Sequence, residues 1–125
     1  IKKYTKILEN NPKNLIALNN IGYALSKLKK FDIALEYYDK SLEINPDDRI
    51  VLVNKISVLR KTGRIDVAID LCDKLLETYP DELILLYHKL RLLKKNNLYE
   101  ESNQICKKIL NVYPSNEEVR NELIK

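Results

Sequence analysis

Residues 15–48 read LIALNNIGYALSKLKKFDIALEYYDKSLEINPDD. Near the end of this stretch stands Pro46, one of several prolines that recur at a fixed spacing. The prolines of the 125-residue chain are Pro12, Pro46, Pro80 and Pro114, and the interval between successive prolines is constant. Repeated units that each expose an apolar face must stack in order to bury it. The proline spacing therefore predicts a solenoid.

Each unit holds two apolar runs of helical length. Leu18, Ile21 and Leu25 follow the spacing of one helix face, and Ala34, Leu35 and Tyr38 follow it again. The first run, which we name helix A, falls at 15–28, 49–62 and 83–95, and the second, helix B, falls at 31–44, 65–78 and 99–112. Short connections make neighbouring helices antiparallel. The sequence predicts an all-α fold of stacked helical hairpins with about seven to eight helices.

The register of the prolines also divides the chain into units. We expect one domain over 1–125, with complete repeats at 15–48, 49–82 and 83–116. Residues 1–14 match the end of a preceding repeat, and 117–125 match the start of a further repeat or a truncated cap. Leu123 and Ile124 leave the last segment apolar, without a polar capping helix. Either further repeats continue the chain, which we favour, or its ends pair with another molecule.

The breaks between helices carry turn residues. Gly63 and Asn97 occupy equivalent positions between helix A and helix B, and both residue types tolerate the left-handed conformation that ends a helix. Lys29 takes that place in the first unit, so we expect a strained or differently built turn there. After the prolines, we expect side chains to accept hydrogen bonds from the first N–H groups of the next helix. These expected caps are Asp47, Asp81 and Ser115.

These features resemble the tetratricopeptide repeat family. The resemblance rests on the constant repeat length, the closing prolines, and small residues at Gly22, Ala34 and Ala68. It implies a right-handed superhelix with a concave groove lined by helices A. Departures occur at Ile56 and Leu90, which stand where Gly22 does, and at Cys72 and Cys106, which stand where Tyr38 does. Because small residues let helices approach closely, we expect the second and third hairpins to be more open.

Charge is segregated between the two kinds of helix. The helix A segments carry net charges of +1, +4 and +4, and the helix B segments carry −3, −3 and 0, by counting Lys and Arg against Asp and Glu. A basic groove would favour an acidic peptide. Lys27, Lys61 and Lys95 recur at one position, but it is the last turn of helix A, where cations also offset the helix dipole. Both interpretations of this lysine row stay open.

A second row holds Asn20, Asn54 and His88, which share one position in successive repeats. An amide both donates and accepts hydrogen bonds, which suits binding to the backbone of an extended peptide. The family's clamp for a terminal carboxylate is not matched, because only Asn54 fits its pattern. Together with Tyr23 and Tyr87 as flat contact surfaces, the candidate ligand-binding residues of the groove are Asn20, Tyr23, Lys27, Asn54, Arg60, Lys61, Tyr87, His88, Arg91 and Lys95.

The sequence offers no catalytic constellation, and we expect no enzyme activity, cofactor or metal site. His88 is the only histidine, and it has no paired thiols near it in sequence. Cys72 and Cys106 share a repeat position in successive B helices, which places them too far apart for a disulfide and predicts two buried thiols.

The sequence predicts a cytoplasmic scaffold or adaptor that binds a protein or peptide partner of acidic character in the helix A groove. Self-assembly through the uncapped ends is one alternative. RNA binding is the other, since the net charge is +4 and helical repeats exist that bind RNA. No membrane association is expected, because the apolar runs are too short to span a bilayer.

Overall fold

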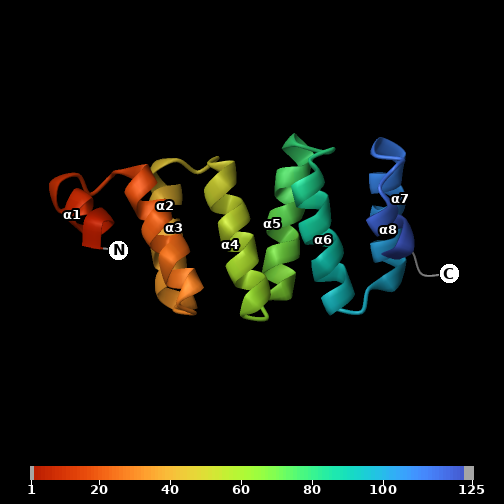
Figure 1. Cartoon of the computed structure of the whole chain (residues 1–125), viewed down its shortest axis with the longest axis horizontal. Coiled ribbons are helices and arrows are strands. Elements are labelled where there is room, and N and C mark those ends of the chain that lie inside the picture. The colour runs from red at the N-terminus through yellow and green to blue at the C-terminus, as the bar shows by residue number, and fades with distance from the viewer. Residues whose placement is uncertain (1, 123–125) are drawn as a thin grey trace. The chain divides into compact units, whose positions relative to one another are not determined.

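The computed structural model describes residues 2–122, which form eight α-helices and no strand (Figure 1). The helices are α1 (Lys2–Asn10), α2 (Leu15–Lys27), α3 (Phe31–Ile44), α4 (Arg49–Lys61), α5 (Ile65–Thr78), α6 (Leu83–Lys95), α7 (Tyr99–Val112) and α8 (Glu117–Glu122). The A helices are thus α2, α4 and α6, and the B helices are α3, α5 and α7. The all-α fold of helical hairpins is confirmed. Leu123 and Ile124 lie outside the described residues.

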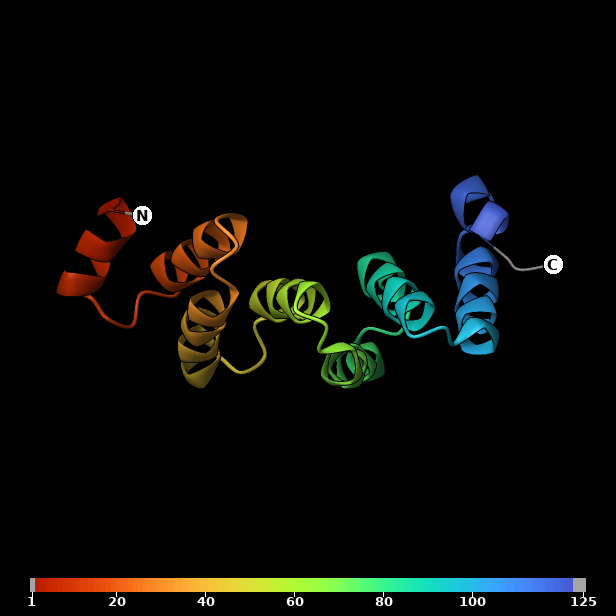
Figure 2. The same ribbon diagram turned by 90° about the horizontal axis from the view of Figure 1, so that it is seen from below.

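The chain forms two compact units that divide between Thr62 and Gly63. In the first unit α2 packs against α1, α3 and α4. In the second unit α6 packs against α5 and α7, and α8 packs against α7. Figures 1 and 2 together show that α2 lies in front of α3 in the first unit, and that α6 lies in front of α5 in the second. In these two pairs, the A helix and the B helix therefore lie at different depths.

The turns that end the A helices share one left-handed residue. Lys29, Gly63 and Asn97 have φ angles of 62°, 78° and 59°. At Lys29, the N–H of Lys30 reaches back to the carbonyl of Leu25 at 2.9 Å, and the same closure recurs after Asn97. The lysine turn is therefore built like the asparagine turn. Its difference is the steric cost of a left-handed conformation on a side chain with an ordinary Cβ.

The helix N-termini correct one prediction from the sequence. The capping residues are Asn14, for which no prediction was made, and Asp48 and Asn116, which lie one residue after the expected Asp47 and Ser115. Their side-chain oxygens accept from the N–H three residues on, at 3.0 Å from Ala17, 3.4 Å from Val51 and 3.0 Å from Val119. Asp47, Asp81 and Ser115 instead occupy the turn after each proline. Glu82, the fourth capping position, makes no side-chain cap because its longer side chain does not close the short ring.

The core of each unit comes from the apolar stripes. In the first unit Gly22 lies directly against Tyr38, since a Cβ at Gly22 would sit 2.6 Å from Tyr38 Cε1. In the second unit Leu86, Leu90, Cys106, Ile109 and Val119 form one buried cluster. The small residue expected between helix A and helix B is therefore on α2 in the first hairpin and on α7 in the third.

Both cysteines are buried and unpaired, as the repeat register predicted. Burial raises the pKa of the Cys72 thiol to about 12, with the neighbouring Asp73 adding to the effect and Lys89 opposing it. Burial likewise raises the pKa of the Cys106 thiol, and Lys94 opposes that shift. Because the thiolate is the reactive form, both residues act as small apolar core residues at neutral pH.

Candidate binding site

The exposed face of α2 combines apolar, amide and basic side chains. Ile16, Asn19, Tyr23 and Lys27 follow helical spacing along this face. Ile16 is 73% exposed and Tyr23 is 49% exposed. The Lys27 Nζ lies 5.1 Å from the centroid of the Tyr23 ring, within range of a cation–π interaction. Two of the predicted binding residues, Tyr23 and Lys27, are thus brought together.

Asn54 connects α4 to α2. Its Nδ2 donates to the Oδ1 of Asn19 over 3.0 Å, and both side chains are half-buried. Asn20, the residue predicted to share a row with Asn54, is also half-buried. One function of Asn54 is therefore structural, because this bond holds neighbouring A helices of the first unit together. A contact between these asparagines and a peptide backbone stays a prediction.

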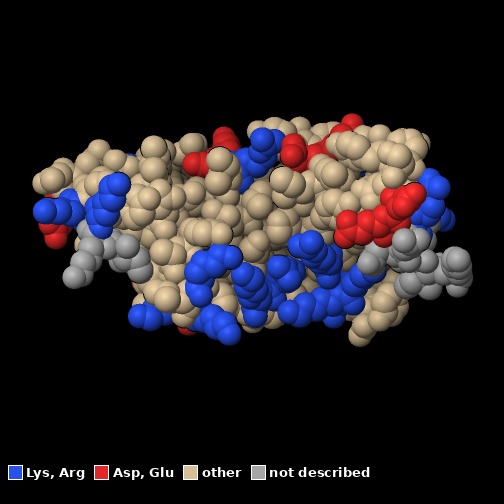
Figure 3. All heavy atoms as spheres, in the orientation of Figure 1, with Lys and Arg blue, Asp and Glu red and all other residues tan. Residues whose placement is uncertain are grey.

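The C-terminal end of α4 is basic. Arg60 is half-buried and Lys61 is exposed. On the face shown in Figure 3, Lys and Arg side chains gather over the lower end of α4, where this helix ends, while the surface over its middle is mostly uncharged. A concentration of cations at one helix end produces a local positive potential.

Two lysines counted in the charge of the A helices are used inside the fold. Lys55 Nζ lies 2.7 Å from Asp39 Oδ1, and Lys89 Nζ lies 2.6 Å from Asp73 Oδ1. Each pair joins an A helix to the B helix before it, and the two pairs occupy the same positions in successive repeats. Sequence reasoning missed these pairs, although the recurrence of both partners is a usable signal. The basic charge that faces outward is accordingly smaller than the segment totals suggest.

In the second unit, α6 and α8 line a cavity of about 200 Å³. Leu90 and Val119 are buried beneath it, Arg91 and Lys94 border it, and Glu118 adds one carboxylate. The remaining lining residue is Tyr87, whose phenol oxygen accepts a hydrogen bond from Asn116 Nδ2 at 2.5 Å. Of the predicted residues, Tyr87 and Arg91 therefore meet at one site. His88 is half-buried and Lys95 is exposed, and neither lines this cavity.

Sequence reasoning also missed a row of exposed isoleucines. Ile16, Ile50 and Ile84 each occupy the second position of an A helix, and their side chains are 73%, 67% and 55% exposed. Their recurrence in each repeat was a visible signal, but apolar residues in an amphipathic helix are normally assigned to its buried stripe. The next position in the row is Glu118 on α8. The apolar row therefore ends in the second unit.

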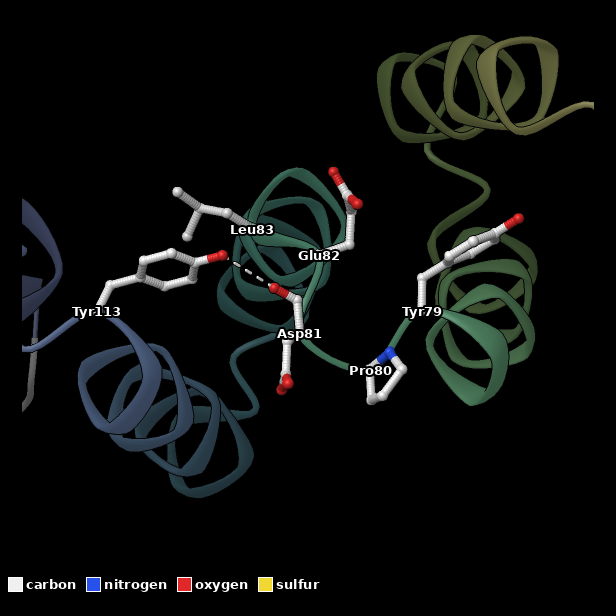
Figure 4. A pocket seen from close by; sticks show the side chains of 6 residues that line it. All are labelled: Tyr79, Pro80, Asp81, Glu82, Leu83 and Tyr113. Carbon is white, nitrogen blue, oxygen red and sulfur yellow. Dashed lines mark hydrogen bonds between the residues drawn. The ribbon is translucent and has the colours of Figure 1, made fainter.

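A second cavity, of about 400 Å³, lies where the chain passes from α5 to α6 (Figure 4). The Tyr113 hydroxyl donates to the backbone carbonyl of Asp81 over 3.1 Å and so ties the end of α7 to this turn. Tyr79 lies on the other side of the start of α6, and the carboxylates of Asp81 and Glu82 lie between the two tyrosines. This acidic lining does not suit an acidic ligand.

No described helix is long and apolar enough to cross a membrane. Within residues 2–122, no three His, Cys, Asp or Glu side chains are grouped so that they could hold a metal ion.

Residues 16–48 match the family model of the tetratricopeptide repeat. No curated protein matches the sequence. Solved structures match nearly the whole chain, and at these identities the likeness concerns the fold. A tetratricopeptide repeat protein from Parabacteroides merdae aligns with a TM-score of 0.83 and 23% identity, covering 93% of this chain and 45% of that one. MamA from Desulfovibrio magneticus aligns with a TM-score of 0.85 and 17% identity, over 98% of this chain and 69% of that one.

A third structure is YrrB, described as a tetratricopeptide-repeat protein with an unusual peptide-binding site. It aligns with a TM-score of 0.75 and 22% identity, over 94% of this chain and 60% of its own. This chain thus spans less than half of the protein from Parabacteroides merdae and under two thirds of YrrB. Residues 16–48 thus match the tetratricopeptide repeat, and nearly the whole chain shares the fold of solved tetratricopeptide-repeat proteins.

Proposed function

We propose that this chain is an adaptor module that binds an acidic segment of a partner protein on the exposed faces of its A helices. The observation that carries the proposal is the basic end of these helices. In the first unit it consists of Lys27, Arg60 and Lys61, and in the second of Arg91, Lys94 and Lys95. The B helices of the same hairpins carry the acidic residues.

The charge of this face exceeds what helix capping needs. One cation in the last turn is enough to offset a helix dipole. Two of the three A helices carry two basic residues there, and α6 adds Arg91 one turn earlier. Lys55 and Lys89 are left out of this count, because they pair with Asp39 and Asp73. The basic side chains at the ends of the A helices would attract carboxylates and speed the encounter with an acidic partner.

The fold supports a scaffold function. Stacked helical hairpins offer an extended surface for another chain, and the structurally similar protein YrrB is described as having a peptide-binding site. A cytoplasmic location forms part of the same proposal. The alternative of self-assembly through the chain ends rests on Leu123 and Ile124, which lie outside the described residues. We therefore test binding of an acidic segment, with variants of the first unit.

The test measures the binding of acidic and neutral peptide pools by fluorescence anisotropy at low and high salt. We expect the acidic pool to bind and to weaken as salt rises. A Lys27→Glu, Arg60→Glu, Lys61→Glu variant should lose at least about tenfold in affinity, because three attractions become repulsions. The matched control reverses three exposed lysines elsewhere in the first unit, as Lys3→Glu, Lys13→Glu, Lys40→Glu. It should stay within about twofold if position rather than net charge decides.

Two outcomes contradict the proposal. Equal binding of both peptide pools would show that charge does not select the partner. Retention of a labelled single-stranded RNA with a steep salt dependence, in the absence of peptide binding, would favour the nucleic-acid alternative.

A further inference from the structure

Each A helix of the first unit presents two chemically different ends on one face. Ile16 and Lys27 on α2 are eleven residues apart in the sequence, and so are Ile50 and Lys61 on α4. Eleven residues of α-helix rise about 16 Å and complete just over three turns, so the two side chains of each pair project in similar directions. The face therefore has an exposed apolar end and an exposed basic end.

In the first unit these ends form two rows. Neighbouring helices α2 and α4 pack against each other, and both run downward in Figure 1. Their N-terminal ends consequently lie on the same side. We name the pair Ile16 and Ile50 the isoleucine row, and Lys27, Arg60 and Lys61 the basic row. Figure 3 shows the basic end over α4, where Lys and Arg side chains gather at its lower end.

The spacing of the rows restricts what can contact both of them. An extended strand that crosses α2 and α4 has its side chains close to one line and would meet only one row. A strand laid along α2 would meet both ends of α2 but would miss α4. A helix with its side chains is about 10–12 Å across. Lying across α2 and α4, it would reach the isoleucine row with one edge and the basic row with the other, because the lysine and arginine side chains bridge the remaining gap.

We propose that the partner segment is an amphipathic α-helix, with adjacent apolar and acidic stripes, that lies across α2 and α4. This inference rests on the proposed function and specifies the conformation of the acidic segment. The apolar stripe would cover two isoleucines that are 73% and 67% exposed. The acidic stripe would neutralise the basic row. The second unit is a poorer site for such a helix, because the positions equivalent to Ile16 and Ile50 are there occupied by Ile84 and Glu118, and only Ile84 is apolar.

The experiment uses the full chain and two designed peptides of about 18 residues. The first has leucines at helical spacing on one stripe and glutamates on the stripe beside it. The second is identical except for one central proline, which costs a helix interior about 3 kcal/mol. We expect the first peptide to bind at least tenfold more tightly, and its far-ultraviolet circular dichroism to show increased helix content on binding.

Protein variants test the two rows separately. Ile16→Ser, Ile50→Ser should weaken the helical peptide at least tenfold, and so should Lys27→Glu, Arg60→Glu, Lys61→Glu. The control is Ile33→Ser, which changes an isoleucine of α3 that is 45% exposed and lies off this face. All of the substituted isoleucines are exposed, so these proteins should keep their fold. The circular dichroism spectrum of the unbound variants checks this directly.

The outcomes separate the two proposals. Equal binding of the two peptides, or full binding to the Ile16→Ser, Ile50→Ser variant, overturns the helix inference and leaves acidic-segment binding standing. Failure of both peptides together with the acidic pool overturns both. Binding of the acidic pool without either designed peptide overturns the helix inference alone.

Discussion

The first and third hairpins solve the same packing problem with opposite residues. In the first, Gly22 on α2 leaves room for Tyr38 on α3. In the third, Leu90 stands at the position of Gly22 and Cys106 at that of Tyr38, and both are buried in one cluster. The large side chain has moved from the B helix to the A helix. The fold depends on the combined volume at this contact, and either helix can supply it.

The exchange has a geometric consequence. The Cα atoms of α2 and α3 come within 8 Å of one another in more places than those of α6 and α7 do. A glycine lets two helix backbones approach, whereas a leucine on the A helix holds them apart.

The largest effect is expected when the leucine of the third hairpin is placed in the first. Gly22→Leu should lower the free energy of unfolding by about 3 kcal/mol, the upper part of the range for overpacked cores. Even the Cβ would lie 2.6 Å from Tyr38 Cε1. Urea unfolding monitored by circular dichroism measures the loss.

The double variant Gly22→Leu, Tyr38→Cys carries the residue pair of the third hairpin and should recover more than half of that loss. Tyr38→Cys alone should be destabilising, because it leaves a cavity beside Gly22. Additive losses in the double variant would show that the two positions do not exchange volume, and would refute the comparison.

The repeat period explains why the fold was predictable. Stacking interactions act between neighbouring units, so a regular sequence produces regular helices, and the B helices begin and end where the sequence predicts. The helix caps after Pro46 and Pro114 were predicted one residue too early, because the residue that follows each proline still belongs to the turn. Asp47 and Asp48 are both good capping residues, so composition alone does not distinguish them.

The site was less predictable for a different reason. Helical spacing shows which residues share a helix face, but it does not show which face stays exposed. Ile16, Ile50 and Ile84 were therefore not predicted as surface residues. Asn54 was predicted to bind a peptide, yet its contact with Asn19 depends on how α2 and α4 meet. Such contacts between elements are set by tertiary packing, which one sequence does not specify.

A smaller effect is expected at the turns that close the two hairpins. Lys29→Gly should raise the free energy of unfolding by about 0.5–1 kcal/mol, because removing the cost of a left-handed lysine outweighs the entropy that glycine adds to the unfolded chain. Asn97→Gly should change it by less, since asparagine already tolerates that conformation. Thermal or urea unfolding of both variants measures the difference. Equal gains at the two turns would show that Lys29 is not strained.

The smallest effect is expected where the two units do not differ. The Lys55–Asp39 and Lys89–Asp73 pairs have nearly equal lengths, and their side chains have similar exposure, at 26% and 53% against 21% and 47%. Each pair should contribute about 0.5 kcal/mol or less, as expected for partly exposed pairs. Double-mutant cycles with Lys55→Met and Asp39→Asn, and with Lys89→Met and Asp73→Asn, measure the two coupling energies at low and high salt. Equal, salt-sensitive values would confine the difference between the units to apolar packing, whereas a coupling energy above about 1 kcal/mol in one unit alone would show that electrostatics also distinguishes them.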